Sequence, residues 1–347
     1  MKYNKVKIGV MAGLLVCAFL VPSISAGAVP ASFDWRDIGG ENFVTPPKNT
    51  GNCGSTWIFG PVAAVESKIM IQNNDASLQP DLSEQHIMSC GVNNTSCSGG
   101  FPGEALEFIQ TTGITAESCF AYTASESTQC NTICANATYS FIDTFTMSYN
   151  LSRTNAEVKQ LIYDEGPVVI NFDVYSDLSS FIGSSVYQQA FGTLEGTKSV
   201  VLIGWGTEGA VDFWAAKNDW GTGWGDGGFF KVKMDDPTVD LSFVYYPGNV
   251  DYDGDGALAI NDCDDTQGAA FPGNSEICDD GIDNDCDGDI DSADSDCAAS
   301  SGGGGGCGTI DTGMGNAGTG KGAWQFALTA MLFLGLWRRQ RRKKAQR

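Results

Sequence analysis

The sequence predicts an α+β fold in which a helical half precedes a strand-rich half. Residues 56–72, TWIFGPVAAVESKIMIQ, carry apolar side chains on most faces, as expected of a buried central helix. Residues 200–205 form an apolar, β-branched run, and FFKVKM at 229–234 alternates apolar and basic side chains. Both later segments are typical of strands. A chain that is 42% hydrophobic has enough apolar residues to build a core around these elements.

Residues 1–28 have the order of a secretory signal peptide. Three lysines precede an apolar run from Ile8 to about Val21, and small residues follow. We expect cleavage after Ala26 or Ala28, because the run is short for a membrane span and ends at Pro22. The alternative is an uncleaved membrane anchor. Either outcome predicts an exported chain.

Export determines how the cysteines are interpreted, because an oxidising compartment favours disulfides. Eleven cysteines remain once Cys17 leaves with the signal peptide. The first six can form three bridges, the next four can form two, and Cys307 is left over. Zinc is not expected, since the chain has one histidine and no repeated C-x-x-C. The cysteines expected in disulfides are Cys53, Cys90, Cys97, Cys119, Cys130, Cys134, Cys263, Cys278, Cys286 and Cys297.

A change in composition near residues 247–250 predicts a domain boundary. The formal net charge is −22, and residues 250–297 alone hold fifteen Asp, one Glu and no Lys or Arg. The negative charge is therefore concentrated in one segment that is suited to bind cations. It argues against a nucleic-acid partner.

The same segment, residues 250–297, repeats the spacing D-x-D-x-D-G-x5-D twice. Alternate carboxylates, a glycine at the sharp turn and a carboxylate at position twelve are what calcium coordination requires. The segment also resembles the Asp- and Cys-rich repeats at the ends of bacterial surface proteins. We predict a calcium-binding repeat; the alternative is a solvated acidic spacer. The expected ligands are Asp251, Asp253, Asp255, Asp262, Asp283, Asp285, Asp287 and Asp294.

The end of the chain predicts attachment to a surface. Residues 298–320 form a glycine-rich linker. In residues 321–347, an apolar run precedes RRQRRKKAQR, and such basic residues orient a segment towards the cytoplasmic side. The arrangement is similar to bacterial C-terminal sorting signals, with Cys307 as the point of processing or lipidation. A plain membrane anchor is the alternative, and both predict a bacterial surface or extracellular location.

Three motifs, in this order, resemble the papain-like cysteine peptidases. NCGSTW at 52–57 is similar to the C-G-S-C-W of that family. LSEQHIMSC at 82–90 and CSGG at 97–100 are similar to L-S-E-Q-x-L-x-D-C and C-x-G-G. FWAAKNDWGTGWGDGGFFKV at 213–232 is similar to Y-W-x-x-K-N-S-W-G-x-x-W-G-x-x-G-Y. The resemblance covers residues 29–246 and implies a papain-like fold with a helical half and a β-rich half.

The resemblance also implies the catalytic positions, and most of them are changed. The nucleophile position is Thr56, the histidine position is Lys198, and the position of the oxyanion-binding glutamine is Thr50. Only the orienting asparagine, Asn218, and the tryptophan that shields it, Trp220, are retained. The family's chemistry needs a thiolate beside an imidazolium, so these substitutions predict an inactive member.

No cysteine–histidine dyad can be assembled from the other residues. The family bridges the cysteine at position 53 to the one at position 97, so that thiol is not expected to be free. The only histidine, His86, falls in a structural position of the family. A substitute dyad of Thr56 and Lys198 is the alternative, but it requires a neutral lysine, against an ordinary pKa of about 10.4.

We therefore expect an exported, inactive papain-like module that binds a peptide or protein ligand. The resemblance implies that a glycine pair contacts an extended ligand and that two tryptophans form an aromatic wall. These residues are Gly99, Gly100, Trp220 and Trp224. We expect no cofactor in this domain. A structural surface adhesin, with the calcium segment as its functional part, is the remaining alternative.

Overall fold

The computed structural model describes residues 29–91, 96–148, 153–181 and 183–298. The predicted signal peptide, almost all of the glycine-rich linker and the C-terminal apolar run lie outside these residues. Within the described part, no helix is both long and apolar enough to cross a membrane.

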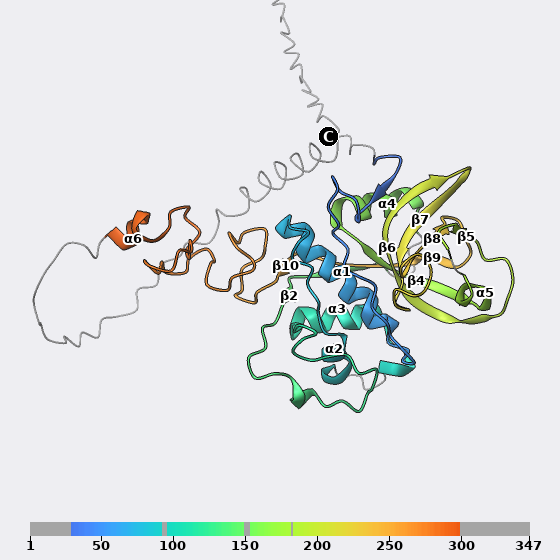
Figure 1. The fold of residues 1–347 in the computed structure, drawn as a ribbon, viewed down its shortest axis with the longest axis horizontal. Coiled ribbons are helices and arrows are strands. Elements are labelled where there is room, and N and C mark those ends of the chain that lie inside the picture. Colours follow the sequence, from blue (N-terminus) through green and yellow to red (C-terminus); the bar gives the residue numbers. More distant parts are fainter. Residues whose placement is uncertain (1–28, 92–95, 149–152, 182, 299–347) are drawn as a thin grey trace, which may run out of the picture.

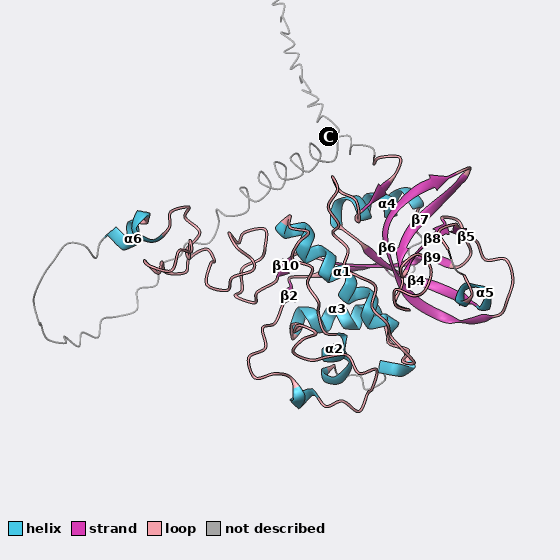
Figure 2. Cartoon of the chain, viewed as in Figure 1, coloured by secondary structure: helices cyan, strands magenta, loops and turns pink. Residues whose placement is uncertain are grey.

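The described chain forms a helical half and a sheet-rich half, as Figures 1 and 2 show. The α+β class predicted from the sequence is confirmed, and the predicted central helix is the longest one. The helices are α1 (Thr56–Asn73), α2 (Glu84–Cys90), α3 (Pro102–Thr111), α4 (Asn155–Glu165), α5 (Ser176–Ser179) and α6 (Ser295–Ala298).

One large sheet dominates the second half, with the strand order β3-β9-β4-β6-β7-β8-β5 and with β1 paired to β6. Its pairs are antiparallel except for β5 with β8. The strands are β1 (Phe33–Asp34), β3 (Phe145–Ser148), β4 (Val168–Tyr175), β5 (Val186–Tyr187), β6 (Leu194–Glu208), β7 (Val211–Lys217), β8 (Phe229–Lys233) and β9 (Val239–Pro247). The two predicted strand segments fall in β6 and β8.

The central helix α1 packs between helices α2 and α3 on one side and the sheet on the other (Figure 1). Almost all of its residues are buried, which explains why its sequence is apolar on most faces. Gly60 allows the close approach to the sheet, because a Cβ there would lie 3.0 Å from Val169 and 3.1 Å from Ser199. The helix ends at Asn73, and its cap residue Asn74 adopts the left-handed conformation with φ 51°.

Five disulfides close the described chain, three in the first part and two in the acidic segment, as the cysteine count predicted. The bridge that the papain resemblance implied, Cys53–Cys97, is present. The others are Cys90–Cys130, Cys119–Cys134, Cys263–Cys286 and Cys278–Cys297.

The acidic segment continues directly from the sheet. Strand β10 (Val250–Asp251) follows β9 and pairs with β2 (Phe141–Ile142) in a separate two-stranded sheet beside α1. Beyond β10 the chain forms loops with little regular structure, and in Figure 1 it extends away from both halves. Aspartate-rich and glycine-rich loops of this kind are held by turns and disulfides, because they have few apolar side chains to bury.

Candidate functional site

Thr56 is the first residue of α1 and lies where the two halves meet. Its Oγ1 donates a hydrogen bond to the carbonyl oxygen of Ser199 at 2.9 Å and accepts one from the Ser199 N–H at 3.2 Å. Ser199 belongs to β6, so the hydroxyl joins the helical half to the sheet. A nucleophilic hydroxyl must pass its proton to a base, and a backbone carbonyl cannot serve as one.

Lys198 lies one residue before Ser199 on β6 and is only 7% exposed. Its Nζ donates hydrogen bonds to Asn218 Oδ1 and Asp219 Oδ1, and it lies 4.3 Å from the ring centre of Trp220. Burial lowers the pKa of Lys198, and the adjacent Asp219 carboxylate opposes that shift. Lys198 and Asp219 thus form a buried ion pair. Among the residues that the structure describes, no hydrogen bond joins Lys198 to the Thr56 hydroxyl.

Asn218 and Asp219 follow the last residue of β7 and are both buried. Lys198 occupies the side-chain oxygen of Asn218, while Asn218 Nδ2 and Asp219 Oδ2 are buried atoms without a hydrogen-bond partner in the described chain. Trp220 stands edge-on to Trp224 with ring centres 5.0 Å apart. The two tryptophans predicted as an aromatic wall are therefore in contact, and Trp220 lies over the lysine.

Thr50 does not provide an oxyanion donor. Its N–H and its hydroxyl both donate to the carbonyl oxygen of Asp219, at 3.0 Å and 3.4 Å. The side chain is buried and points its proton at the protein's own backbone. The structure thus brings the four predicted catalytic positions together, but within the described residues the Thr50 side chain is already engaged with the backbone.

Gly99 and Gly100 lie beside the Cys53–Cys97 disulfide. Gly99 has φ +105°, and a Cβ on it would meet no atom within 4 Å, so its backbone faces open space. Gly100 is held against the ring of Trp57, where a Cβ would lie 2.5 Å from ring atoms. The next residue, Phe101, is 69% exposed. This strip offers an accessible backbone and an exposed aromatic ring to a ligand.

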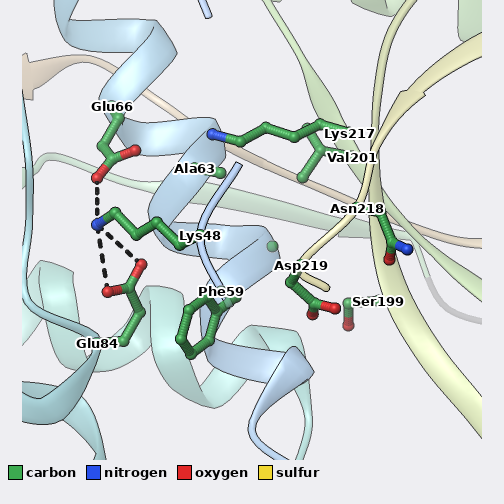
Figure 3. A pocket seen from close by; sticks show the side chains of 11 residues that line it. Lys48, Phe59, Ala63, Glu66, Glu84, Ser199, Val201, Lys217, Asn218 and Asp219 are labelled. Atoms are coloured by element: carbon green, nitrogen blue, oxygen red, sulfur yellow. Dashed lines mark hydrogen bonds and ion pairs between the residues drawn. The ribbon is translucent and has the colours of Figure 1, made fainter. Parts of the chain in front are cut away.

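A buried charge cluster beneath the cleft was not predicted. Lys48 Nζ lies 2.9 Å from Glu66 of α1 and 3.1 Å from Glu84 of α2, as Figure 3 shows. Lys217 Nζ donates to Thr45 at 2.8 Å, and the Thr45 hydroxyl donates to Glu66. A glutamate inside the apolar run of the central helix was the signal that could have indicated it.

The cavity between these charged side chains is about 20 Å³, which is room for about one water molecule. It is therefore too small for a substrate. Burial raises the pKa of Glu84 to about 8, and the Lys48 ammonium opposes the shift. We interpret the cluster as a network of ion pairs and hydrogen bonds that holds the N-terminal segment against helices α1 and α2.

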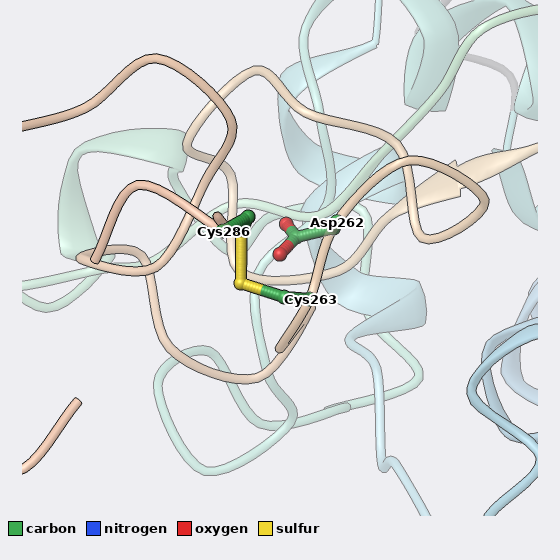
Figure 4. Close-up of side chains that lie close together, drawn as sticks. All are labelled: Asp262, Cys263 and Cys286. Atoms are coloured by element: carbon green, nitrogen blue, oxygen red, sulfur yellow. A yellow bond between two sulfur atoms is a disulfide. The ribbon is translucent and has the colours of Figure 1, made fainter. Parts of the chain in front are cut away.

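The acidic segment gathers its predicted carboxylates into two groups. In the first, ligand oxygens of Asp251, Asp253 and Asp255 lie within 4.8 Å of one another, as do those of Asp253, Asp262 and Asp265. Asp265 was not predicted, because it lies outside the twelve-residue spacing. The side chains of Asp262, Cys263 and Cys286 also lie together, but the two cysteines form a disulfide and are not thiolate ligands (Figure 4).

The second group follows the same plan. Oxygens of Asp285, Asp287 and Asp294 lie within 4.8 Å of one another, and those of Asp283 and Asp285 lie near Glu276, a residue that was not predicted. Asp294 is fully buried, and its Oδ2 has no hydrogen-bond partner in the described chain. An orphaned buried carboxylate oxygen facing two further carboxylates fits a bound cation.

Comparisons with known proteins identify the family of the larger part of the chain. A family model for papain family cysteine proteases matches residues 29–242, more than half of the chain. The chain belongs to the papain family. A second model, of a metal-binding motif named for copper-binding MopE, matches residues 262–292. It covers the end of the first acidic group and all of the second group except Asp294.

Relatives of the papain family match at moderate identity. A cathepsin L-like proteinase of Fasciola hepatica is 34% identical over 208 residues, which are 59% of this chain and 60% of that proteinase. Cysteine proteinase 1 of Entamoeba histolytica is 31% identical over 230 residues, covering 64% of this chain and 70% of the relative. This chain thus spans about 60% of the first relative's length.

Solved structures confirm the papain-like fold. Digestive procathepsin L2 from the larval midgut of Tenebrio molitor matches with a TM-score of 0.53 and 30% identity, over 63% of this chain and 68% of that one. The bromelain protease of Ananas comosus, solved in complex with the E64 inhibitor, matches with a TM-score of 0.53 and 26% identity, over 63% and 99% of the two chains.

His86 lies on α2 of the papain-family domain, away from the cleft residues. It is 2% exposed, accepts a hydrogen bond at Nδ1 from the Thr115 N–H at 3.4 Å, and contacts the ring of Phe108 with centres 5.0 Å apart. Burial lowers its pKa to about 4. The structure therefore places the only histidine in the core of the helical half.

Histidine titration provides a direct test, because His86 gives a single resonance. We expect the NMR midpoint near pH 4 and not near the ordinary 6.5, since the folded core excludes the charged ring. A lowered folded pKa means that this contribution to stability is complete above pH 6.5. It falls by about 3 kcal/mol as the pH drops to 4. A midpoint near 6.5 would contradict the buried, neutral assignment.

Proposed function

We propose that this papain-family protein is exported and that its cleft binds peptide or protein ligands without cleaving them. The proposal rests on one observation: the residues at the two substituted catalytic positions are each bonded to other partners. Thr56 is hydrogen-bonded to the Ser199 backbone, and Lys198 is paired with Asp219. Neither contributes to a nucleophile-base pair, so the chemical step lacks both of its proton-transfer partners.

The binding half of the proposal rests on the accessible strip around Gly99. An extended ligand can hydrogen-bond to its open backbone in the manner of an added strand, and Phe101 offers apolar surface beside it. The Cys53–Cys97 bridge and Trp57 fix this strip from behind. Binding therefore needs no catalytic group.

An immobilised peptide library, scored for cleavage and retention together, tests the proposed function. We expect retained peptides and no cleaved ones. Gly99→Leu should reduce retention at least about tenfold, because its side chain fills the space that the ligand occupies. Gly209→Leu is the matched control, since this glycine also has positive φ (+62°) and open space but lies between β6 and β7. Equal retention by both variants would contradict the assignment.

A hydrolase that uses Thr56 and Lys198 remains the second candidate. One observation favours it: burial lowers the pKa of Lys198, and a neutral amine can act as a base. The hydrogen bond from Nζ to the Asp219 carboxylate favours the charged form instead, and the threonine hydroxyl is directed to Ser199. The contacts therefore favour the hypothesis that the protein is inactive.

We further propose that the acidic segment binds calcium. Its converging groups are carboxylates, hard oxygen ligands that suit Ca²⁺, whereas copper sites favour imidazole and sulfur. The cysteines of residues 250–297 are all in disulfides, and the only histidine lies in the helical half. The donor atoms present therefore differ from those favoured by copper, the metal in the name of the matched motif.

Calorimetric titration of the full-length protein tests the metal and its ligands. We expect about two Ca²⁺ ions per chain, one for each acidic group. Asp294→Asn should remove about one of them, because Asp294 Oδ2 is buried and unpaired in the second group. Asp296→Asn, two residues away and exposed, is the control. Tight Cu²⁺ binding with no Ca²⁺ heat would reverse the choice of metal.

The proposed location is a bacterial cell surface or the extracellular space. Its support is the signal-like N-terminus and the apolar, basic C-terminus, both outside the described residues. A module that binds peptides without cleaving them has to be exposed at the surface but needs no catalysis. The proposed location therefore agrees with the proposed peptide binding. Fractionation of cells that express the tagged protein, before and after surface protease treatment, would test the location.

A further inference from the structure

The first acidic group, from Asp251 to Asp265, is attached to the end of the helix that carries Thr56. Helix α1 ends at Asn73, and the side chain of Gln72 makes two hydrogen bonds where the acidic segment begins. Its Nε2 donates to Oδ1 of the preceding residue, Asn249, and its Oε1 accepts from the Val250 N–H, both at 2.8 Å. Val250 is fully buried. The start of the acidic segment is therefore part of the papain-family domain's packing.

Asp265 links the acidic group to the helix directly. One carboxylate oxygen, Oδ2, accepts a hydrogen bond from Asn73 Nδ2 at 2.7 Å, and the other accepts one from the Tyr252 N–H at 2.8 Å. Asp265 is only 2% exposed. Its ligand oxygen lies within 4.8 Å of those of Asp253 and Asp262. Because each carboxylate oxygen has a second lone pair, Asp265 can hold Asn73 and a cation together.

The interior of the group contains unsatisfied oxygens. Oδ2 of Asp253, Asp255 and Asp262 are buried atoms, and none has a hydrogen-bond partner in the described chain. Asp251 holds the loop around them, since its two oxygens accept the N–H groups of Gly254 and Gly256. Buried carboxylates without a compensating partner are costly, and residues 250–297 contain no Lys or Arg to provide one.

Backbone contacts extend the attachment to the other side of the helical half. Ser140, which precedes β2, donates through its hydroxyl to the carbonyl of Tyr252 at 2.7 Å. Gly254 passes so close to Tyr139 that a Cβ would lie 2.3 Å from its carbonyl oxygen. The acidic loop therefore contacts two segments of the helical half, α1 and the chain around β2.

We propose that a divalent cation bound by Asp253, Asp255, Asp262 and Asp265 acts as a clamp that stabilises the papain-family domain through Asn73. The inference rests on the calcium binding proposed above and assigns it a regulatory consequence. Cation binding fixes Asp265, and fixed Asp265 holds the last turn of α1. Since the clamp forms only in the folded state, occupancy raises the free energy needed to open that turn.

Hydrogen-deuterium exchange of the full-length protein, read from peptides that cover residues 62–73, measures this coupling. At a Ca²⁺ concentration one hundred times the dissociation constant, we expect about one hundredfold slower exchange than in EDTA. Asp265→Asn should lower this ratio at least about tenfold, because the ligand that reaches Asn73 loses its charge. Asp287→Asn, in the second acidic group, should leave the ratio unchanged.

Asn73→Ala separates the clamp from the calcium site. We expect this variant to keep the calorimetric stoichiometry of the parent protein and to lose most of the Ca²⁺-dependent protection of residues 62–73. Ca²⁺ binding that leaves exchange of this peptide unchanged would overturn the clamp while the proposed calcium site stands. Absence of Ca²⁺ binding in the calorimetric titration would overturn both.

Discussion

Purified full-length protein should hydrolyse peptide substrates about 10⁴-fold to 10⁶-fold more slowly than active papain-family peptidases, because loss of a nucleophile or its base typically costs that much. Here both positions are changed, and the structure commits Thr56 to the Ser199 backbone and Lys198 to Asp219. Fluorogenic peptides and product analysis by mass spectrometry measure the rate. Turnover that disappears in Thr56→Ala or in Lys198→Ala would overturn the assignment.

Restoring the two family residues should produce weak cleavage. The combined variant Thr56→Cys and Lys198→His places a thiol at the N-terminus of α1 and an imidazole beside Asn218, the geometry that the family uses. We expect activity above the parent but well below that of active relatives, because Thr50 directs its hydroxyl to the Asp219 carbonyl.

A third substitution measures the missing oxyanion donor. Adding Thr50→Gln to the combined variant should raise its rate, since one oxyanion donor contributes about 10²-fold to 10³-fold. Thr56→Cys alone is the matched control and should stay inactive, because it has a nucleophile without a base. No recovery in the triple variant, with its melting temperature unchanged, would show that features beyond these three positions disable the cleft.

Breaking the Lys198–Asp219 pair should destabilise the protein by about 3–5 kcal/mol. Lys198→Met leaves the Asp219 carboxylate buried without a counter-charge: Oδ1 loses the lysine, and Oδ2 already has no hydrogen-bond partner in the described chain. Adding Asp219→Leu to Lys198→Met should recover most of the loss, because an apolar pair carries no desolvation penalty. Urea unfolding of the parent, both single variants and the combined variant gives the coupling energy.

The pair Lys231–Glu208 is the control for this cycle. Its atoms lie 2.6 Å apart, but the two side chains are 29% and 47% exposed. Its coupling should therefore stay below about 1 kcal/mol. A similar coupling for the two pairs would mean that Lys198 and Asp219 are hydrated in solution, and the structural role assigned to them would be wrong.

Much of the fold could be predicted because local patterns determine it. Apolar residues on most faces predicted the central helix, and the alternation of apolar and basic side chains at 229–234 predicted β8. The papain-like motifs then predicted Thr56, Lys198 and Asn218 at one site. In the structure Lys198 contacts Asn218, and the residue after Lys198, Ser199, contacts Thr56. The calcium-loop spacing likewise grouped Asp285, Asp287 and Asp294 correctly.

The missed residues share a physical cause: their partners are far away in the chain. Glu66 and Glu84 belong to different helices, and only the packing of those helices brings both to Lys48. Asp265 lies beyond the twelve-residue spacing and meets Asn73 across a separation of 192 residues. No periodicity or motif encodes contacts of this kind.

The sequence by itself determined the α+β class, the substitutions at the catalytic positions and the carboxylates available for a cation. Each depends on residue identity or on spacing within a short segment, where backbone geometry restricts the outcome. Only the tertiary structure decided what the substituted residues do. Thr56 contacts Ser199 across a separation of 143 residues. The packing of the helical half against the sheet, and not local propensity, directs the Thr56 hydroxyl to a carbonyl and the Lys198 amine to a buried carboxylate.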